Sequence, residues 1–197
     1  MQKPERIFNW LLGISVLSWA AFALLDPSVQ RPIAVRLSVT SLHLFVGVLI
    51  LVRTEVREHG SAKMLLMAIP AVIVGGWSFY LTAAWNFWSQ SILSIGALTT
   101  IVSLGYLGRN FSILPAKRSI VSSGPYRIVR HPVYTGELVM LLACTIASSS
   151  IFGVLVFLAA VILIGIRIFA EEQLLQTDSI YQTYTSTVRW RLIPRIW

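Results

Sequence analysis

The polar residues best suited to chemistry lie in one short segment, residues 124–137. This segment brings two tyrosines, two arginines, a histidine and a glutamate together directly before an apolar stretch. Pro132 suits the first turn of a helix, and Tyr134 and Glu137 would then share one face of that helix. A helix N-terminus favours an anion, and Arg130 strengthens that preference. The segment therefore predicts a pocket that grips the carboxylate of an amino acid.

A second polar cluster, Arg167 to Glu172, closes the last apolar stretch of the chain. Arg167 and Glu171 lie four residues apart and can pair across one helical turn. Glu172 points to a different face, where it is free to engage a ligand. Alone, this pattern is typical of a solvated helix end with a snorkelling arginine. Two such clusters at adjacent ends of one helical hairpin instead favour a binding site.

The elements that must position these clusters are strongly apolar. Of the 197 residues, 56% are hydrophobic and 12% are charged, which is roughly half the charged fraction of a soluble domain. The apolar residues fall into blocks near the ~20 residues that a helix needs to cross a bilayer. Backbone at membrane depth must satisfy its own hydrogen bonds, which favours helices. We therefore predict an all-α integral membrane protein with six hydrophobic helices, at Ile7–Leu25, Ile33–Val52, Met64–Trp85, Ser91–Gly108, Pro132–Ser148 and Ile151–Ala170.

The last two blocks are separated only by serines 148–150, which predicts a tight hairpin. The segment after Glu171 is polar enough to leave the bilayer, first as a continuation of the last helix. The sequence thus predicts one continuous membrane domain with two regions. Residues 1–108 form a four-span region with little chemistry, and residues 109–197 form the hairpin and a cytoplasmic C-terminal tail. The glycines at 75, 76, 105 and 108 are expected at close helix contacts.

The net charge of +8 does not indicate nucleic acid, because the cations segregate by connection. They precede the first block, fill the connections after the second and fourth, and recur in the tail, whereas the opposite connections contain only Arg31. The positive-inside rule then predicts a multi-pass protein in the lipid bilayer with both termini in the cytoplasm. Cys144 is the only cysteine and lies in an apolar run, so we expect neither a disulfide framework nor a metal site. His43, in mid-span without a second ligand-type residue nearby, is expected to bond a neighbouring helix.

Several motifs together resemble the isoprenylcysteine carboxyl methyltransferase family, which belongs to a wider group that includes phospholipid N-methyltransferases. The resemblance covers about residues 109–197. It is carried by Gly124-Pro125-Tyr126, by Arg130-His131-Pro132-Val133-Tyr134-Thr135-Gly136, by Glu171-Glu172, and by Tyr181, Tyr184, Arg189 and Pro194.

The resemblance implies that S-adenosylmethionine binds between the hairpin and the tail. Ser119, Ile120 and Val121 would line one wall of that pocket. Arg167 would orient the substrate near the transferred methyl group, and with Glu172 it would form the catalytic set. The residues expected to contact the cofactor are Tyr126, Arg130, His131, Pro132, Val133, Tyr134, Glu137, Glu171 and Glu172.

The acceptor stays open at this point, because the first four blocks match no prenyl-cysteine-recognising residue. A lipid-like or prenylated acceptor with a carboxylate would be oriented by Arg167, whereas an amine would need a base such as Glu172 or His131. Three alternatives to carboxyl methylation are a phospholipid or small-lipid N-methyltransferase, an NADPH-dependent membrane reductase, and a non-catalytic transport or interaction protein. The third is disfavoured because the polar groups gather on one face, with no polar stripe through the spans.

Overall fold

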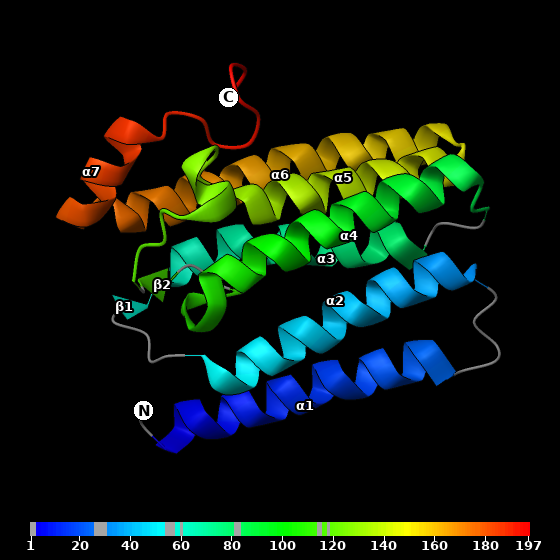
Figure 1. The fold of residues 1–197 in the computed structure, drawn as a ribbon, viewed down its shortest axis with the longest axis horizontal. Coiled ribbons are helices and arrows are strands. Elements are labelled where there is room, and N and C mark those ends of the chain that lie inside the picture. The colour runs from blue at the N-terminus through cyan, green and yellow to red at the C-terminus, as the bar shows by residue number, and fades with distance from the viewer. Residues whose placement is uncertain are drawn as a thin grey trace.

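The computed structural model describes residues 3–25, 31–53, 58–59, 61–80, 84–113, 116–117 and 119–197. In these ranges the protein is a bundle of long helices lying side by side (Figure 1). The long helices are α1 (Lys3–Leu25), α2 (Ile33–Val52), α3 (Ala62–Tyr80), α4 (Phe87–Leu107), α5 (Pro132–Ser148) and α6 (Ile151–Leu175). Shorter elements are β1 (Glu58–His59), β2 (Ala116–Lys117), the 3-10 turns η1 (Gly108–Asn110) and η2 (Gly124–Arg127), and α7 (Ser179–Thr187).

Each of the six predicted blocks coincides with a helix, so the all-α fold is confirmed. The boundaries differ where local capping decides them. Helix α4 begins at Phe87 rather than Ser91, because the Asn86 side chain accepts a hydrogen bond from the Ser89 N–H at 2.9 Å. Helix α3 is described as far as Tyr80, and residues 81–83, through which the predicted block continues, lie outside the described part of the chain.

Within the described residues, α1, α2, α4 and α6 are long and apolar enough to cross a bilayer, and α3 and α5 are shorter apolar helices. Large apolar side chains cover the outward faces, as Ile151, Leu155 and Ile162 do on α6. So extensive an exposed apolar surface is typical of contact with lipid. The protein is an integral membrane protein.

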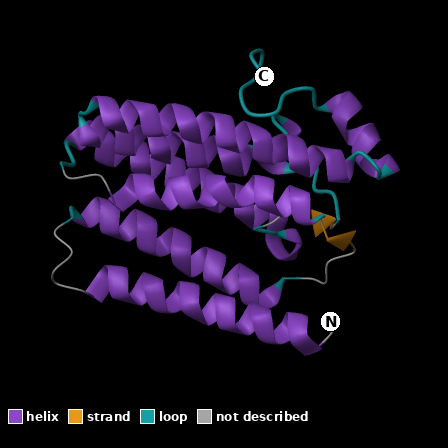
Figure 2. Cartoon of the chain, turned by 180° about the vertical axis from the view of Figure 1, so that it is seen from behind, coloured by secondary structure: helices purple, strands orange, loops and turns teal. Residues whose placement is uncertain are grey.

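The helices pack in an order that differs from their order in the chain. Helix α1 packs on α2, α2 on α4, and α4 on α5, while α3 packs chiefly on α6. Figures 1 and 2 show α3 and α4 lying beside the α5–α6 hairpin, with the β1–β2 pair and α7 toward the end that holds the N-terminus. Helices α3 and α4 therefore flank the hairpin, whereas α1 packs on α2 at the far side of the bundle.

Glycines allow two of these helix pairs to approach closely. A Cβ atom on Gly136 would lie 2.2 Å from Oγ1 of Thr100 and 2.8 Å from the carbonyl oxygen of Gly96. A Cβ on Gly13 would likewise lie 3.3 Å from the carbonyl oxygen of Gly47. Small residues permit such backbone contact between membrane helices.

Of the glycines singled out from the sequence, Gly76 and Gly108 do not serve this purpose, so the prediction was wrong for them. A Cβ on Gly75 would lie 3.4 Å from Oε1 of Glu137 on α5, which is an ordinary contact between helices. A Cβ on Gly76 or Gly108 would meet no heavy atom within 4 Å, and one on Gly105 would meet only the Phe45 ring at 3.8 Å. Sequence spacing cannot tell which face of a helix meets a neighbour when all its faces are apolar.

The predicted hairpin is confirmed, since α5 ends at Ser148 and α6 begins at Ile151. Ser149 adopts a left-handed conformation (φ 48°), and the Ser150 hydroxyl caps α6 by accepting from the Gly153 N–H at 3.1 Å. At the other end α6 continues through Glu172 to Leu175, as predicted. The short β1–β2 pairing, which the sequence did not predict, joins the α2–α3 connection to the α4–α5 connection.

Candidate active site

Glu172 is the centre of an ionic network that joins three parts of the chain. Its Oε1 accepts from Nε of Arg130 at 2.8 Å and from Nε2 of His131 at 3.0 Å, while its Oε2 accepts from Nε of Arg191 at 2.9 Å. Both Glu172 and His131 are about 5–6% exposed. The sequence predicts a Glu172 free to meet a ligand, and this geometry corrects that expectation. Its carboxylate is bonded to cations that the sequence could not assign to it.

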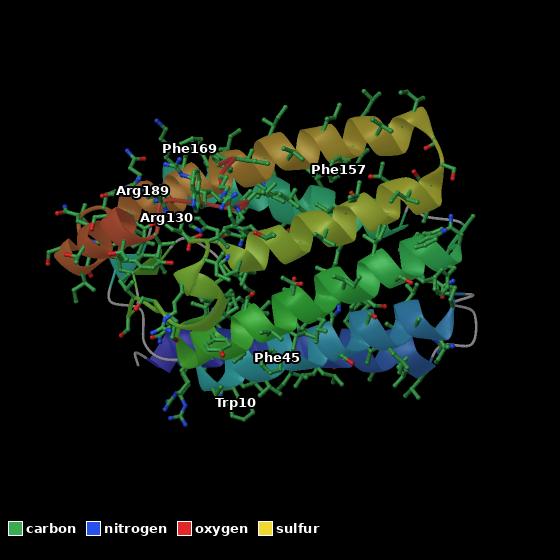
Figure 3. All side chains as sticks on the ribbon, turned by 45° about the horizontal axis from the view of Figure 1, so that its top comes forward. Trp10, Phe45, Arg130, Phe157, Phe169 and Arg189 are labelled. Carbon is green, nitrogen blue, oxygen red and sulfur yellow. The ribbon has the colours of Figure 1, made fainter. Side chains whose placement is uncertain are left out.

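The C-terminal tail is also fixed by its backbone to the loop before α5. The N–H groups of Arg130 and His131 donate to the carbonyl oxygens of Trp190 and Arg191 at 2.8 and 2.9 Å. Nη1 of Arg130 donates to the carbonyl oxygens of Val188 and Arg189, each at 3.1 Å. In Figure 3, Arg130 and Arg189 lie together where α6 and α7 meet, close to Phe169, whereas Phe157 lies farther along α6.

One helical turn toward the bundle interior, a second set of contacts crosses the hairpin. The Tyr134 hydroxyl donates to Oε2 of Glu171 at 2.7 Å, and its ring stacks on His131 with centroids 5.6 Å apart. The Arg167 guanidinium lies over the Tyr134 ring, 4.9 Å from its centroid, and donates to the carbonyl oxygen of Ile113. Arg167 is thus directed to Tyr134 and Ile113, and its predicted hydrogen-bonded pairing with Glu171 is replaced by the bond between Tyr134 and Glu171.

Three tyrosines from the loop and the tail complete the cluster. The Tyr184 hydroxyl donates to the carbonyl oxygen of Tyr126 at 2.8 Å, and the Tyr181 and Tyr184 rings lie 5.9 Å apart. Burial raises the pKa of Tyr184 to about 12 and raises the pKa of Tyr126 and Tyr181 well above the usual value for a phenol. All three side chains are therefore protonated hydrogen-bond donors at neutral pH.

Some buried polar atoms of this cluster have no protein partner. In the described part of the chain, the hydroxyls of Tyr126 and Tyr181 and Nε of Arg167 are buried without a hydrogen bond. Leaving a polar group in this state costs about 1–3 kcal/mol. Such atoms are consistent with a site that completes its hydrogen bonds with a polar ligand.

A cavity of about 820 Å³ connects this cluster to the interior of the bundle. The volume falls in the range of small-molecule binding sites, about 300–1,000 Å³. Its polar end is formed by Tyr126, Arg130, His131, Tyr134, Glu137, Arg167 and Glu171. Its apolar part is formed by side chains of α2, α4 and α5, among them Val39, Leu42, Val46, Leu93, Leu104, Met140 and Leu141. Along α4 the lining extends from Leu93 to Leu107, or roughly 20 Å of helix.

The structure brings most of the predicted site residues together. One group surrounds Glu172, and the other surrounds Tyr134. Val133 lines the cavity with the polar residues just named, and Pro132 is buried at the first position of α5, as predicted. Ser119, Ile120 and Val121 do not line this cavity, and Ile120 instead packs against the tyrosine cluster. Which of these residues contact a cofactor stays a prediction.

Two participants were missed by sequence reasoning. Arg191 looks in the sequence like one of several tail cations, and only its contact with Glu172 and the nearby rings of Phe169 and Trp197 distinguishes it. The carbonyl oxygen of Ile113 carries no side-chain signal.

Fold and site together define a membrane-embedded protein with a cluster of polar residues that opens into a largely apolar cavity. Residues 71–183, more than half of the chain, match the family model of the phospholipid methyltransferases, and the protein belongs to that family. That family group includes isoprenylcysteine carboxyl methyltransferases and phospholipid N-methyltransferases, so the resemblance found in the sequence is confirmed at this level. A search of curated proteins found no match. The protein is a membrane methyltransferase, and methyltransferases of this family generally use S-adenosylmethionine.

Proposed function

We propose that this protein transfers a methyl group from S-adenosylmethionine to a lipid-like acceptor, with a carboxylate of the isoprenylcysteine type favoured. The observation that carries the proposal is a cavity that joins a cluster of ionisable groups around Tyr134 to an apolar lining that extends through the bundle. A water-soluble donor and a lipid can meet in such a space from opposite sides. Methyl transfer requires both in one water-poor site.

The polar end offers the donor set that a nucleoside amino acid needs. Tyr126 at this end, and Tyr181 in the adjoining tyrosine cluster, present buried hydroxyls without protein partners, which suits the carboxylate and hydroxyl groups of the cofactor. Glu172 acts in this proposal through Arg130 and His131, whose positions it fixes. Bound S-adenosylmethionine supplies an electrophilic methyl group on a sulfonium centre.

The chain's contribution to the reaction is alignment and exclusion of water. Arg167 holds the acceptor carboxylate in line by charge-assisted hydrogen bonds. One carboxylate oxygen gains the bond to the methyl carbon as the sulfur–carbon bond breaks, and the electron pair of that bond goes to sulfur. No proton is transferred, because the acceptor is already ionised and the products are a methyl ester and a neutral thioether.

An amine acceptor is the second candidate, favoured by the family description and by two carboxylates in the cavity wall. Glu171 lines the cavity beside Tyr134 and could accept the proton that an ammonium must lose before methylation. The two candidates share the cofactor site and differ only in the group placed at Arg167.

The site is proposed to face the cytoplasm. The N-terminal end of α1, the β1–β2 pair and α7 lie toward one end of the bundle (Figure 1). In the sequence the cations concentrate at the start of α1, in the connections after α2 and α4, and in the tail after α7. Both arrangements support a positive-inside orientation with cytoplasmic termini.

The test is transfer of an isotope-labelled methyl group in lipid discs, offered either an S-farnesyl cysteine derivative or phosphatidylethanolamine. We expect label in a base-labile ester of the prenylated acid, and Arg167→Lys should lose most of this turnover while it keeps affinity for S-adenosylhomocysteine. Lysine keeps the charge but loses the planar fork that holds both carboxylate oxygens. Label in the phospholipid amine alone would favour the second candidate. Normal turnover by Arg167→Lys would remove the role proposed for this residue.

A further inference from the structure

Glu137 lies on the second turn of α5 with its carboxylate facing the cavity. Among the described residues, this carboxylate makes no hydrogen bond and no ion pair within 4.0 Å. An ionisable side chain at membrane depth is costly and is retained where it binds or transfers something. Glu137 takes no part in the hydrogen-bonded network around Glu172. A partner for the Glu137 carboxylate must therefore come from the cavity.

Arg167 lies at the same depth as Glu137 on the opposing helix. The Tyr134–Glu171 hydrogen bond fixes the register of the two antiparallel helices. Glu137 is three residues beyond Tyr134 and Arg167 is four residues before Glu171, so both lie one turn, about 5 Å, deeper. The described contacts of Arg167 are with the Tyr134 ring and the carbonyl oxygen of Ile113, and none of them is with Glu137.

The wall beside Glu137 is kept open by glycine. A Cβ atom on Gly75 of α3 would lie 3.4 Å from Oε1 of Glu137, and a Cβ on Gly76 would meet no heavy atom within 4 Å. Both glycines line the cavity. A glycine inside a helix costs about 0.5–1 kcal/mol relative to alanine. The two adjacent glycines, Gly75 and Gly76, leave space beside the Glu137 carboxylate.

Glu137 and Arg167 therefore present an acceptor and a donor across one cavity, each with unused hydrogen-bonding capacity. The Nε of Arg167 has no partner, and the Glu137 carboxylate can only accept while it is ionised. A ligand that satisfies both carries an anionic oxygen for Arg167 and a hydrogen-bond donor, such as an N–H group, for Glu137. An apolar chain attached to this head would continue into the apolar part of the cavity.

We propose that Glu137 is a specificity-determining residue that accepts a hydrogen bond from the nitrogen next to the acceptor's carboxylate. In this arrangement the acceptor's carboxylate lies at Arg167 and its N–H at Glu137. This inference rests on the proposed function and assigns a residue to the N–H group of its acceptor. Glu137 positions the acceptor and takes no part in cofactor binding, in contrast to the role expected from the sequence.

The test compares two acceptors that differ in this N–H group. N-acetyl-S-farnesylcysteine carries the amide, and 3-(farnesylthio)propionic acid lacks it. Their affinities are measured by calorimetry in lipid discs, with and without saturating S-adenosylhomocysteine. A hydrogen bond to a charged group is worth about 1.5–3 kcal/mol, so the wild-type protein should prefer the amide by roughly 10- to 150-fold.

Glu137→Leu should bring this preference to near unity by weakening the amide acceptor alone. Glu137→Gln, which keeps an oxygen acceptor but not the charge, should retain a preference of a few-fold. His43→Leu is the matched control, because His43 lines the same cavity while its Nδ1 bonds the carbonyl oxygen of Val39 in its own helix. The His43→Leu variant should keep the full preference for the amide acceptor. Affinity for S-adenosylhomocysteine should be unchanged in all three variants, which also shows that they fold.

A wild-type preference that survives in Glu137→Leu would overturn the inference. So would loss of S-adenosylhomocysteine affinity with an intact acceptor preference, since Glu137 would then belong to the cofactor site. The proposed function fails separately, if the wild-type protein binds these acids but transfers no methyl group to them. Absence of binding to either acid would overturn both.

Discussion

Nε of Arg191 in the C-terminal tail lies 2.9 Å from Oε2 of Glu172 on α6, and this contact holds the tail against the site. The same carboxylate positions Arg130 and His131 through its other oxygen. A residue outside the hairpin thereby supports the residues expected to meet the cofactor.

Arg191→Met should therefore weaken S-adenosylhomocysteine binding and lower the thermal unfolding temperature in detergent. The contact is partly exposed, so its loss should cost about 1–2 kcal/mol, or roughly 5- to 30-fold in affinity. Arg189→Met is the matched control, because the Arg189 side chain is exposed and only its backbone contacts Arg130. Calorimetry and thermal melting of both variants check this. Equal losses of affinity and of melting temperature in the two variants would show that the overall positive charge of the tail causes the effect, and that the contact with Glu172 does not.

His131→Ala should reduce S-adenosylhomocysteine affinity far more than His43→Ala. His131 bonds Glu172 and stacks on Tyr134, whereas His43 bonds its own helix. Loss of a charged hydrogen bond in a buried site costs about 1.5–3 kcal/mol, or on the order of 10- to 150-fold in affinity. Isothermal titration of the two variants measures the difference. Similar losses in both would place the cofactor elsewhere in the cavity.

Gly136→Ala should destabilise the bundle, while Gly76→Ala should be tolerated. A methyl group on Gly136 meets the backbone of α4 at 2.8 Å, so the α4–α5 pair must separate. Overpacking of this kind costs about 1–3 kcal/mol. A methyl group on Gly76 would meet no heavy atom within 4 Å. Thermal unfolding in detergent compares the pair, and an unchanged melting temperature for Gly136→Ala would mean that the two helices are less tightly apposed.

The orientation can be read from two introduced cysteines in a Cys144→Ala background. Ser123 precedes η2 at the end of the bundle that holds the site, and Ser149 lies in the α5–α6 turn at the other end. In intact cells an impermeant thiol reagent should label a cysteine at position 149 and spare one at position 123, as the positive-inside rule predicts. The reverse pattern would place the site on the outer face.

The helices were predictable because bilayer thickness alone requires long apolar segments. The site loop was predictable for a related reason. Arg130, His131 and Tyr134 stand out as polar residues directly before an apolar helix, and Glu171-Glu172 stand out after one. Both signals are local in sequence, so spacing suffices to read them.

The contacts between these segments were not predictable from spacing. Glu172 appeared free because its partner Arg191 lies 19 residues away in a tail without a periodic pattern. The contact of Gly96 with Gly136 depends on which helices become neighbours, which a uniformly apolar sequence does not encode visibly. Glu137 could be assigned to a helix face, but its position opposite Arg167 follows only from the register of α5 against α6.

The most direct test of the central claim is a calorimetric titration of the purified protein in lipid discs with S-adenosylhomocysteine and, separately, with NADPH. The proposed site requires saturable binding of S-adenosylhomocysteine at one site per chain and no heat of binding from NADPH. Binding of NADPH without binding of S-adenosylhomocysteine would contradict the account and indicate a membrane reductase built on the same hairpin.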